Sequence, residues 1–186
     1  MHPSIRQVLA LAALAAVIPA TAHAQFERNT KLGVFAGATV PVSDFGNYNS
    51  TGFNIGALIE FKPALSPMGL RFDGTYHRLG FKTGFTGSSG STSVWNLNAN
   101  AVLSPPASPL YLIGGAGVYS LTDNYQGSTF RPSSGTKVGF NVGGGFRIPL
   151  TGFDTFLEAR YHLINMGSDG NSRSVKMIPI SFGVRF

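Results

Sequence analysis

The last eleven residues, Lys176–Phe186, read K-M-I-P-I-S-F-G-V-R-F, and they indicate the fold. Counted back from the C-terminal position, every second residue is large and apolar: Phe186, Val184, Phe182, Ile180 and Ile178. The residues between them are mostly small or polar: Arg185, Gly183, Ser181, Pro179 and Met177. A period of two predicts a β-strand with two different faces.

The composition of the whole chain agrees with a β-structure. The 186 residues include 24 Gly and 15 Phe, and only 12% are charged. Few helix formers and many aromatic residues favour an all-β protein. The chain has no Cys, which excludes thiol catalysis, disulfides and cysteine-based metal sites.

The first 24 residues have the pattern of a secretory signal. Met1–Gln7 carries Arg6, Val8–Ile18 is apolar, and Ala22-His23-Ala24 has the small-x-small spacing of a cleavage site. We therefore expect a cleaved signal peptide at 1–24 and a mature domain at 25–186. The alternative is a helical anchor, but the apolar stretch is too short to span a bilayer. After it, no apolar run is long enough for a spanning helix, so a membrane location would require a closed barrel.

Period-two segments continue through the mature chain. The predicted strands are 32–40, 53–61, 70–78, 94–103, 110–121, 138–148, 153–163 and 176–186. Their connections alternate between short ones with Pro and Gly, such as that near Pro105, and long polar ones, such as that after Leu121. Short turns at one rim and long loops at the other are typical of outer-membrane barrels.

One face of each predicted strand is apolar, and the other is polar or small. Up-and-down threading places outward aromatic residues in two bands, as in barrels that sit in lipid. We expect a loop-side band of Phe53, Trp95, Tyr119, Phe140 and Tyr161. The expected turn-side band is Phe61, Phe72, Tyr111, Phe146, Phe153 and Phe186.

Two stretches fit this pattern less well. The segment 110–121 is apolar on both faces, and its phase is chosen to place Tyr111 and Tyr119 in the bands. Pro179 lies inside the last strand without an N–H for the ladder, so we expect a bulge there or a late start to full pairing.

These features resemble the small eight-stranded bacterial outer-membrane β-barrel family, which includes the OmpA membrane domain and OmpX. The likeness covers 31–186 and includes the phrase F-L-E-A-R-Y-H at 156–162. It implies an antiparallel up-and-down transmembrane barrel in the bacterial outer membrane, with short periplasmic turns and long extracellular loops. It also implies that Ile178, Ile180, Phe182, Val184 and Phe186 are read by the barrel-insertion machinery. Since the chain stops at this strand, we expect no periplasmic peptidoglycan-binding domain.

The strand phases place ionisable side chains in the lumen. Four carboxylates balance four guanidinium groups there, and two histidines lie near the loop end: Glu60, Asp73, Asp154, Glu158, Arg71, Arg147, Arg160, Arg185, His77 and His162. An eight-stranded barrel encloses little more than its own side chains, so such charges must pair. We interpret them as a structural plug rather than as a catalytic or conducting site.

The remaining charges lie at the rims. Without the signal segment, 13 Lys and Arg stand against 8 Asp and Glu, an excess of five positive charges. Cations at the loop rim could bind lipopolysaccharide phosphates or could be an ordinary solvated rim. They are Arg78, Lys82, Arg131, Lys137, Arg173 and Lys176. Nucleic-acid binding is not expected, because the cations are scattered and a signal segment precedes them.

No motif in the sequence carries recognisable chemistry. The glycines at 114–117 and 143–145 do not open a helix and lack the residues of a phosphate loop. His77 and His162 could meet with Glu158 or Asp73 in an acid-base or metal site, but two histidines are a weak signal. We therefore expect no cofactor, no metal and no catalytic residue.

Three functions remain open. A structural or surface-interaction role through the loops is favoured; a narrow pore and a lipid-modifying enzyme are the alternatives. The lipid A deacylase family has a Ser two positions after its lipid-facing His, whereas Ile164 follows His162 at that spacing. The palmitoyltransferase family carries an N-terminal amphipathic helix, for which 25–30 is too short. A soluble lipocalin-like barrel is the alternative fold, and a monomer is favoured.

Overall fold

The computed structural model describes residues 30–63, 66–82, 90–125, 135–165 and 174–186, so the expected signal peptide at 1–24 lies outside the described part. The described residues form eight strands and one short helix, α3 (Asp44–Tyr48). The strands are β1 (Thr30–Val42), β2 (Gly52–Phe61), β3 (Met68–Gly80), β4 (Gly90–Leu103), β5 (Leu110–Tyr125), β6 (Gly135–Leu150), β7 (Phe153–Asn165) and β8 (Ser174–Arg185). No described helix is long and apolar enough to cross a membrane.

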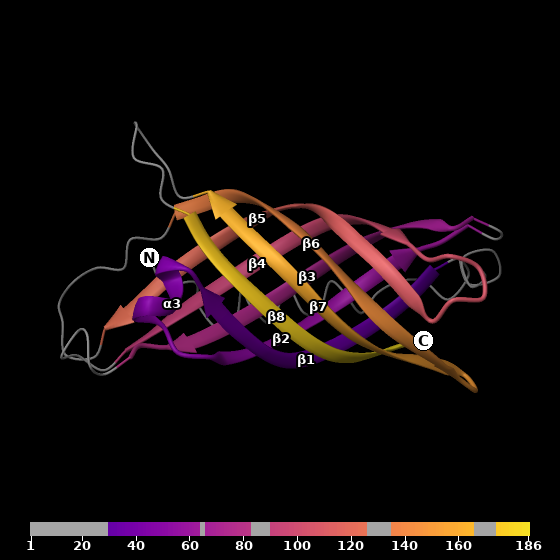
Figure 1. Cartoon of the computed structure of the whole chain (residues 1–186), viewed down its shortest axis with the longest axis horizontal. Helices are drawn as coiled ribbons and strands as arrows, with labels where there is room; N and C mark the ends of the chain where they lie inside the picture. Colours follow the sequence, from indigo (N-terminus) through magenta and orange to yellow (C-terminus); the bar gives the residue numbers. More distant parts are fainter. Residues whose placement is uncertain (1–29, 64–65, 83–89, 126–134, 166–173) are drawn as a thin grey trace, which may run out of the picture.

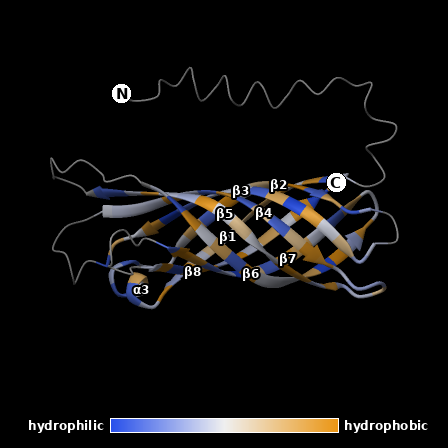
Figure 2. Cartoon of the chain, turned by 90° about the horizontal axis from the view of Figure 1, so that it is seen from above, coloured by the Kyte–Doolittle hydropathy of each residue, from blue (hydrophilic) through white to orange (hydrophobic). Residues whose placement is uncertain are grey.

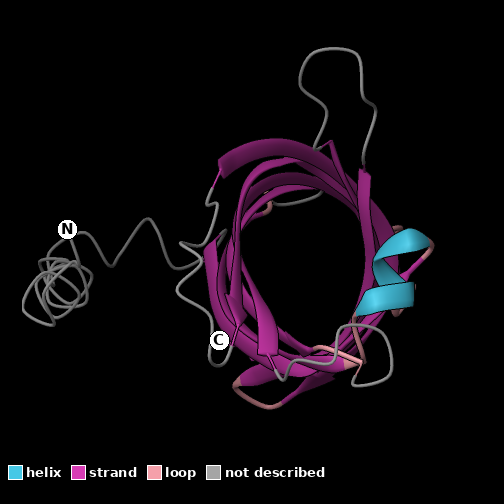
Figure 3. Cartoon of the chain, turned by 90° about the vertical axis from the view of Figure 1, so that its left-hand side faces the viewer, coloured by secondary structure: helices cyan, strands magenta, loops and turns pink. Residues whose placement is uncertain are grey.

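The strands close into one antiparallel barrel. Each strand pairs with the next along the chain, and β8 pairs with β1 (Figures 1 and 3). At the seam, Leu32 and Phe186 exchange two backbone hydrogen bonds of 3.0 and 2.9 Å. The predicted eight-stranded up-and-down barrel is therefore confirmed.

Short connections lie at one rim, which we call the turn rim, and long connections lie at the other, the loop rim (Figure 1). The strands run further toward the loop rim than the sequence predicts. For example, Gly90 and Tyr125 still pair in the ladder between β4 and β5. Helix α3 lies at the loop rim, where Phe45 packs against the end of the lumen (Figure 3).

The alternation of faces is as predicted in six of the seven strands for which the sequence analysis assigns an outward face. In β7, for instance, Leu157 is 53% exposed on the outer face, and its neighbour Glu158 is 3% exposed in the lumen. Figure 2 shows the same alternation as apolar and polar segments along the strands. In the last strand, Ile180, Phe182 and Phe186 are exposed outward, whereas Ile178 and Val184 are half-buried. Their reading by the insertion machinery stays a prediction.

The predicted phase of β5 is wrong. Tyr111 and Tyr119 are 2% and 0% exposed and point into the lumen, so neither belongs to an aromatic band. The rings fit there because β6 carries inward glycines beside them. A Cβ at Gly145 would contact the Tyr111 ring, and one at Gly139 would lie 2.8 Å from Tyr119 Cε2. Leu112 and Val118 face outward instead.

Pro179 causes a local gap in pairing rather than a bulge. On the β1 side the ladder is continuous, and Pro179 stands opposite Thr39. On the β7 side, pairing stops after Ala159–Ile180 and resumes at His162–Met177. Because both strands advance by three residues across the gap, the register is unchanged. The strand therefore tolerates the missing donor by losing contacts on one side.

Candidate functional site

The lumen is the candidate site, because buried polar and charged side chains from most of the strands meet there. Its eight predicted charged residues all face inward, and they form one connected set of ion pairs. Glu60 on β2 is its centre, 3% exposed and bound by guanidinium groups from three other strands. The distances are 2.7 Å to Arg71 Nη2, 3.0 Å to Arg147 Nη2 and 2.8 Å to Arg185 Nη1.

The network continues from Glu60 toward the loop rim. Arg71, which is fully buried, also donates to Glu158 at 2.6 Å. Glu158 in turn accepts from Arg160 Nε at 2.9 Å, and Arg160 Nη1 lies 3.0 Å from Asp73. The charges therefore compensate one another along the lumen, as desolvated ions require.

The other arm of the network reaches the turn rim. Arg185 Nη2 donates to Asp154 at 3.0 Å, and Lys31 Nζ lies 3.2 Å from the same carboxylate. Lys31 is not among the lumen charges that the sequence predicts, so its place at the end of the network is an addition to the predicted set.

Neutral side chains that the prediction missed complete the coordination of these ions. Asn98 and Asn100 donate to Asp73 at 3.1 and 2.7 Å, and Tyr111 donates its hydroxyl to Glu158 at 2.7 Å. The Tyr111 ring also lies 4.2 Å from the Arg147 guanidinium carbon, within cation–π range. The sequence N-L-N-A-N at 96–100 predicts a polar face for β4. The inward direction of Tyr111 could not be predicted in the same way, because β5 is apolar on both faces.

The two histidines meet near the loop end of the lumen, and each has a hydroxyl group as the partner of its Nδ1. Their ring centroids lie 6.2 Å apart in an edge-to-face arrangement. His77 Nδ1 hydrogen-bonds to Thr39 Oγ1 at 2.8 Å, and His162 Nδ1 to the Tyr119 hydroxyl at 2.9 Å. Within the described ranges, no group of three or more His, Asp or Glu is arranged to hold a metal ion.

An apolar cluster fills the lumen above the histidines at the loop end. It consists of Leu79, Val94, Tyr119, Leu121, Ile164 and Met177, with Phe45 of α3 and Val175 packed against it. At the same end of the barrel, the Thr92 hydroxyl donates a hydrogen bond to Asp123 at 2.6 Å. The lumen thus has an ionic layer toward the turn rim and an apolar layer toward the loop rim.

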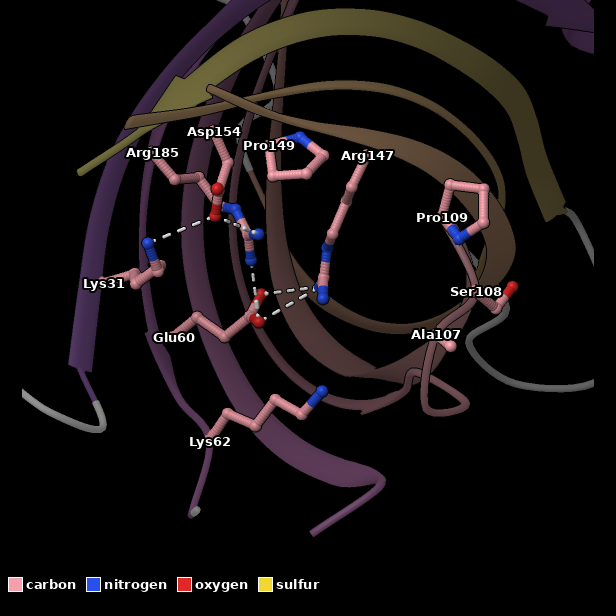
Figure 4. Close-up of a pocket in the computed structure, with 10 residues that line it drawn as sticks. All are labelled: Lys31, Glu60, Lys62, Ala107, Ser108, Pro109, Arg147, Pro149, Asp154 and Arg185. Atoms are coloured by element: carbon pink, nitrogen blue, oxygen red, sulfur yellow. Dashed lines mark hydrogen bonds and ion pairs between the residues drawn. The ribbon is translucent and has the colours of Figure 1, made fainter. Parts of the chain in front are cut away.

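The turn-side mouth of the lumen is an open pocket of about 600 Å³ (Figure 4). Its charged lining residues are Lys31, Glu60, Lys62, Arg147, Asp154 and Arg185. Ala107, Ser108 and Pro109 from the connection between β4 and β5 form the wall that faces Arg147 and Lys62 (Figure 4). The pocket therefore ends at the ion pairs of Glu60.

The loop-rim cations predicted to bind lipopolysaccharide have different surroundings. Arg78 is exposed at the loop end of β3, and Lys82 Nζ donates to the Gly46 carbonyl at 2.6 Å. Lys137 and Lys176 are half-buried near the loop ends of β6 and β8. Arg131 and Arg173 lie outside the described residues.

A model of the outer membrane protein beta-barrel domain family matches residues 8–186. No curated protein sequence shows significant similarity to the chain. Neisserial surface protein A has a similar structure, with a TM-score of 0.58 and 20% identity over 84% of this chain and 95% of that chain. The attachment invasion locus protein Ail of Yersinia pestis, solved in complex with the heparin analogue sucrose octasulfate, has a TM-score of 0.56 and 19% identity, covering 85% and 99%. A major outer membrane protein from Thermus thermophilus gives 0.53 and 12%, covering 84% and 98%. At these identities the structural likeness concerns the fold.

Proposed function

We propose that this chain is a non-conducting scaffold whose extracellular loops contact other surfaces. It belongs to the outer membrane protein β-barrel family and lies in the bacterial outer membrane. The paired charges of the lumen act as a plug that prevents ions from passing through the barrel. The functional contacts then fall to the loops and to the loop rim.

The observation that carries this proposal is the continuity of the ion pairs. Glu60, Arg71, Glu158, Arg160 and Asp73 are each at most 5% exposed, and every neighbour in this series is joined by contacts of 3.0 Å or less. An ion that entered the lumen would have to break these pairs and then pass the apolar cluster around Leu79. Both steps oppose conduction.

The experiment is conductance in planar lipid bilayers with the refolded protein. We expect no current above background. The variant R71A/E158A removes one cation and one anion and so preserves the net charge, and it serves as the open-lumen comparison. A steady single-channel conductance of the unaltered chain would contradict the proposal and favour the narrow pore.

We also propose that the loop rim contacts lipopolysaccharide phosphates through Arg78. Arg78 is exposed on the outward face of β3, two residues beyond Tyr76, whose ring contacts that of Trp95 with centroids 4.7 Å apart. The complex of Ail with a sulfated sugar suggests an anionic probe of the same kind. Binding to lipopolysaccharide should weaken in R78Q and recover in part in R78K, because Lys retains the charge and loses the bidentate geometry. Equal affinity of all three proteins would exclude Arg78.

No enzymatic role is proposed. His162 is 1% exposed inside the lumen and is bound to Tyr119, so it is not available to a lipid on the outer surface. The mass spectrum of lipid A should therefore be the same in cells with and without the gene. A new or missing acyl chain would revive the lipid-modifying alternative.

A further inference from the structure

The turn-side pocket carries more positive than negative charge. Lys31, Lys62, Arg147 and Arg185 line it against only two carboxylates, Glu60 and Asp154. With Lys and Arg protonated and both carboxylates ionised, the lining has an excess of two positive charges. The ion-pair network of the lumen is otherwise balanced, so this excess is concentrated at the mouth.

The donors that could hold a ligand are already present. Lys62, the residue after β2, has no hydrogen-bond or ion-pair partner anywhere in the described residues, and its amine reaches into the pocket (Figure 4). Arg185 is 3% exposed, and its Nε–H is buried without a partner in the described chain. The Nε–H of Arg147 is in the same situation. A buried donor without an acceptor costs free energy, which an anionic ligand would offset once the guanidinium group turned its Nε–H toward it.

We propose that this pocket is a binding site for a phosphate group presented from the periplasmic side. A phosphate supplies several acceptor oxygens and close to two negative charges near neutral pH, which matches both the donors and the excess charge. The terminal nitrogens of both arginines are already bound to Glu60, Asp154 and Ser104, so the two Nε–H groups and the Lys62 amine are the donors left for this anion. The pocket volume of about 600 Å³ exceeds that of free phosphate, so a phosphorylated small molecule or a phospholipid headgroup also fits.

Lys62 separates this site from the structural network. Its side chain takes no part in the ion pairs around Glu60, so K62Q should leave the fold intact. The matched control is K137Q, which removes the same charge from a half-buried lysine at the opposite rim. Boiled and unboiled samples on SDS gels verify that both variants refold.

The test is titration calorimetry at low salt in a phosphate-free detergent. Two probes are used, inorganic phosphate and the short-chain lipid dihexanoyl phosphatidic acid. We expect binding that weakens about tenfold in K62Q and is unchanged in K137Q, as the loss of one charged contact implies.

Tighter binding of the lipid identifies a headgroup as the source, and binding of inorganic phosphate alone identifies a free phosphate. Absence of binding for both probes, or equal weakening in the two variants, would overturn the proposal. Conductance plays no part in this test, so its result does not depend on whether the barrel is closed.

Discussion

Replacing Glu60 by Gln tests whether the ion pairs stabilise the barrel. The substitution keeps the size of the side chain and removes the carboxylate on which Arg71, Arg147 and Arg185 converge. Arg71 still has Glu158, and Arg185 still has Asp154. Arg147 keeps the Ser104 hydroxyl at 2.9 Å and the Tyr111 ring at 4.2 Å, but no carboxylate among the described residues. The side chain of Arg147 is 13% exposed, so it becomes a largely buried cation without a counter-ion.

Breaking a buried ion pair from one side typically costs about 3–5 kcal/mol. Since two of the three guanidinium groups retain a carboxylate, we expect E60Q to lower the free energy of unfolding by about 3 kcal/mol, at the low end of that range. The double variant E60Q/R147Q removes the orphaned cation as well. It should recover about 2 kcal/mol of the loss, which is a normal coupling energy for residues in one network.

The assay is urea unfolding in lipid vesicles, followed by the fluorescence of Trp95 and by the SDS-gel mobility of unboiled samples. Trp95 is the only tryptophan and is 61% exposed on the outer face, so its emission reports membrane insertion. The exposed carboxylate Asp44 on α3 provides the control, and D44N should change stability by less than about 0.5 kcal/mol. A loss below about 1 kcal/mol in E60Q, or a double variant less stable than the single one, would refute the reasoning.

Three further substitutions test other features of the barrel. Y111F should cost about 1–3 kcal/mol in the same assay because Glu158 loses a buried donor, whereas Y161F on the outer face should have little effect. G145A should destabilise the barrel by about 1–3 kcal/mol because its Cβ would meet the Tyr111 ring. G114A should leave the stability unchanged, because its Cβ would lie 3.6 Å from its nearest neighbour. Equal effects of the two substitutions would contradict the packing of Tyr111. F186A should reduce the amount of folded protein in the outer membrane of cells more than F153A does, with unchanged refolding in vitro; equal amounts in cells would argue against the insertion signal.

The sequence is informative wherever the two faces of a strand differ. In a membrane barrel the outer face meets lipid and the inner face meets other side chains, so an alternation such as Leu157 and Glu158 has one consistent interpretation. For the same reason the inward direction of all eight charged residues could be predicted. The alternation also identifies Asn96, Asn98 and Asn100 as inward, although their roles as donors do not follow from it.

The phase of β5 could not be predicted from β5 itself, because Leu112 and Ile113, like Val118 and Tyr119, are neighbours of similar hydrophobicity. The usable signal lay on the next strand. Gly139 and Gly145 on β6 face inward, and an inward glycine leaves room for an aromatic ring from the adjacent strand. A buried phenol hydroxyl also needs a partner, and the lumen offers Glu158 and His162, whereas the lipid belt offers none.

The partners of Glu60 mark the limit of what pattern alone can determine. Arg71 stands directly opposite Glu60 in the hairpin of β2 and β3, so a short turn near Pro63 and the strand phases are sufficient to predict that pair. Arg147 and Arg185 come from β6 and β8, 87 and 125 residues away in the chain, and they reach Glu60 across the lumen. Their height in the barrel depends on the stagger accumulated through every intervening strand pair, and no single hairpin encodes that stagger. The balance of four acids and four bases therefore indicates that the charges pair, but which ones meet follows only from the closed barrel.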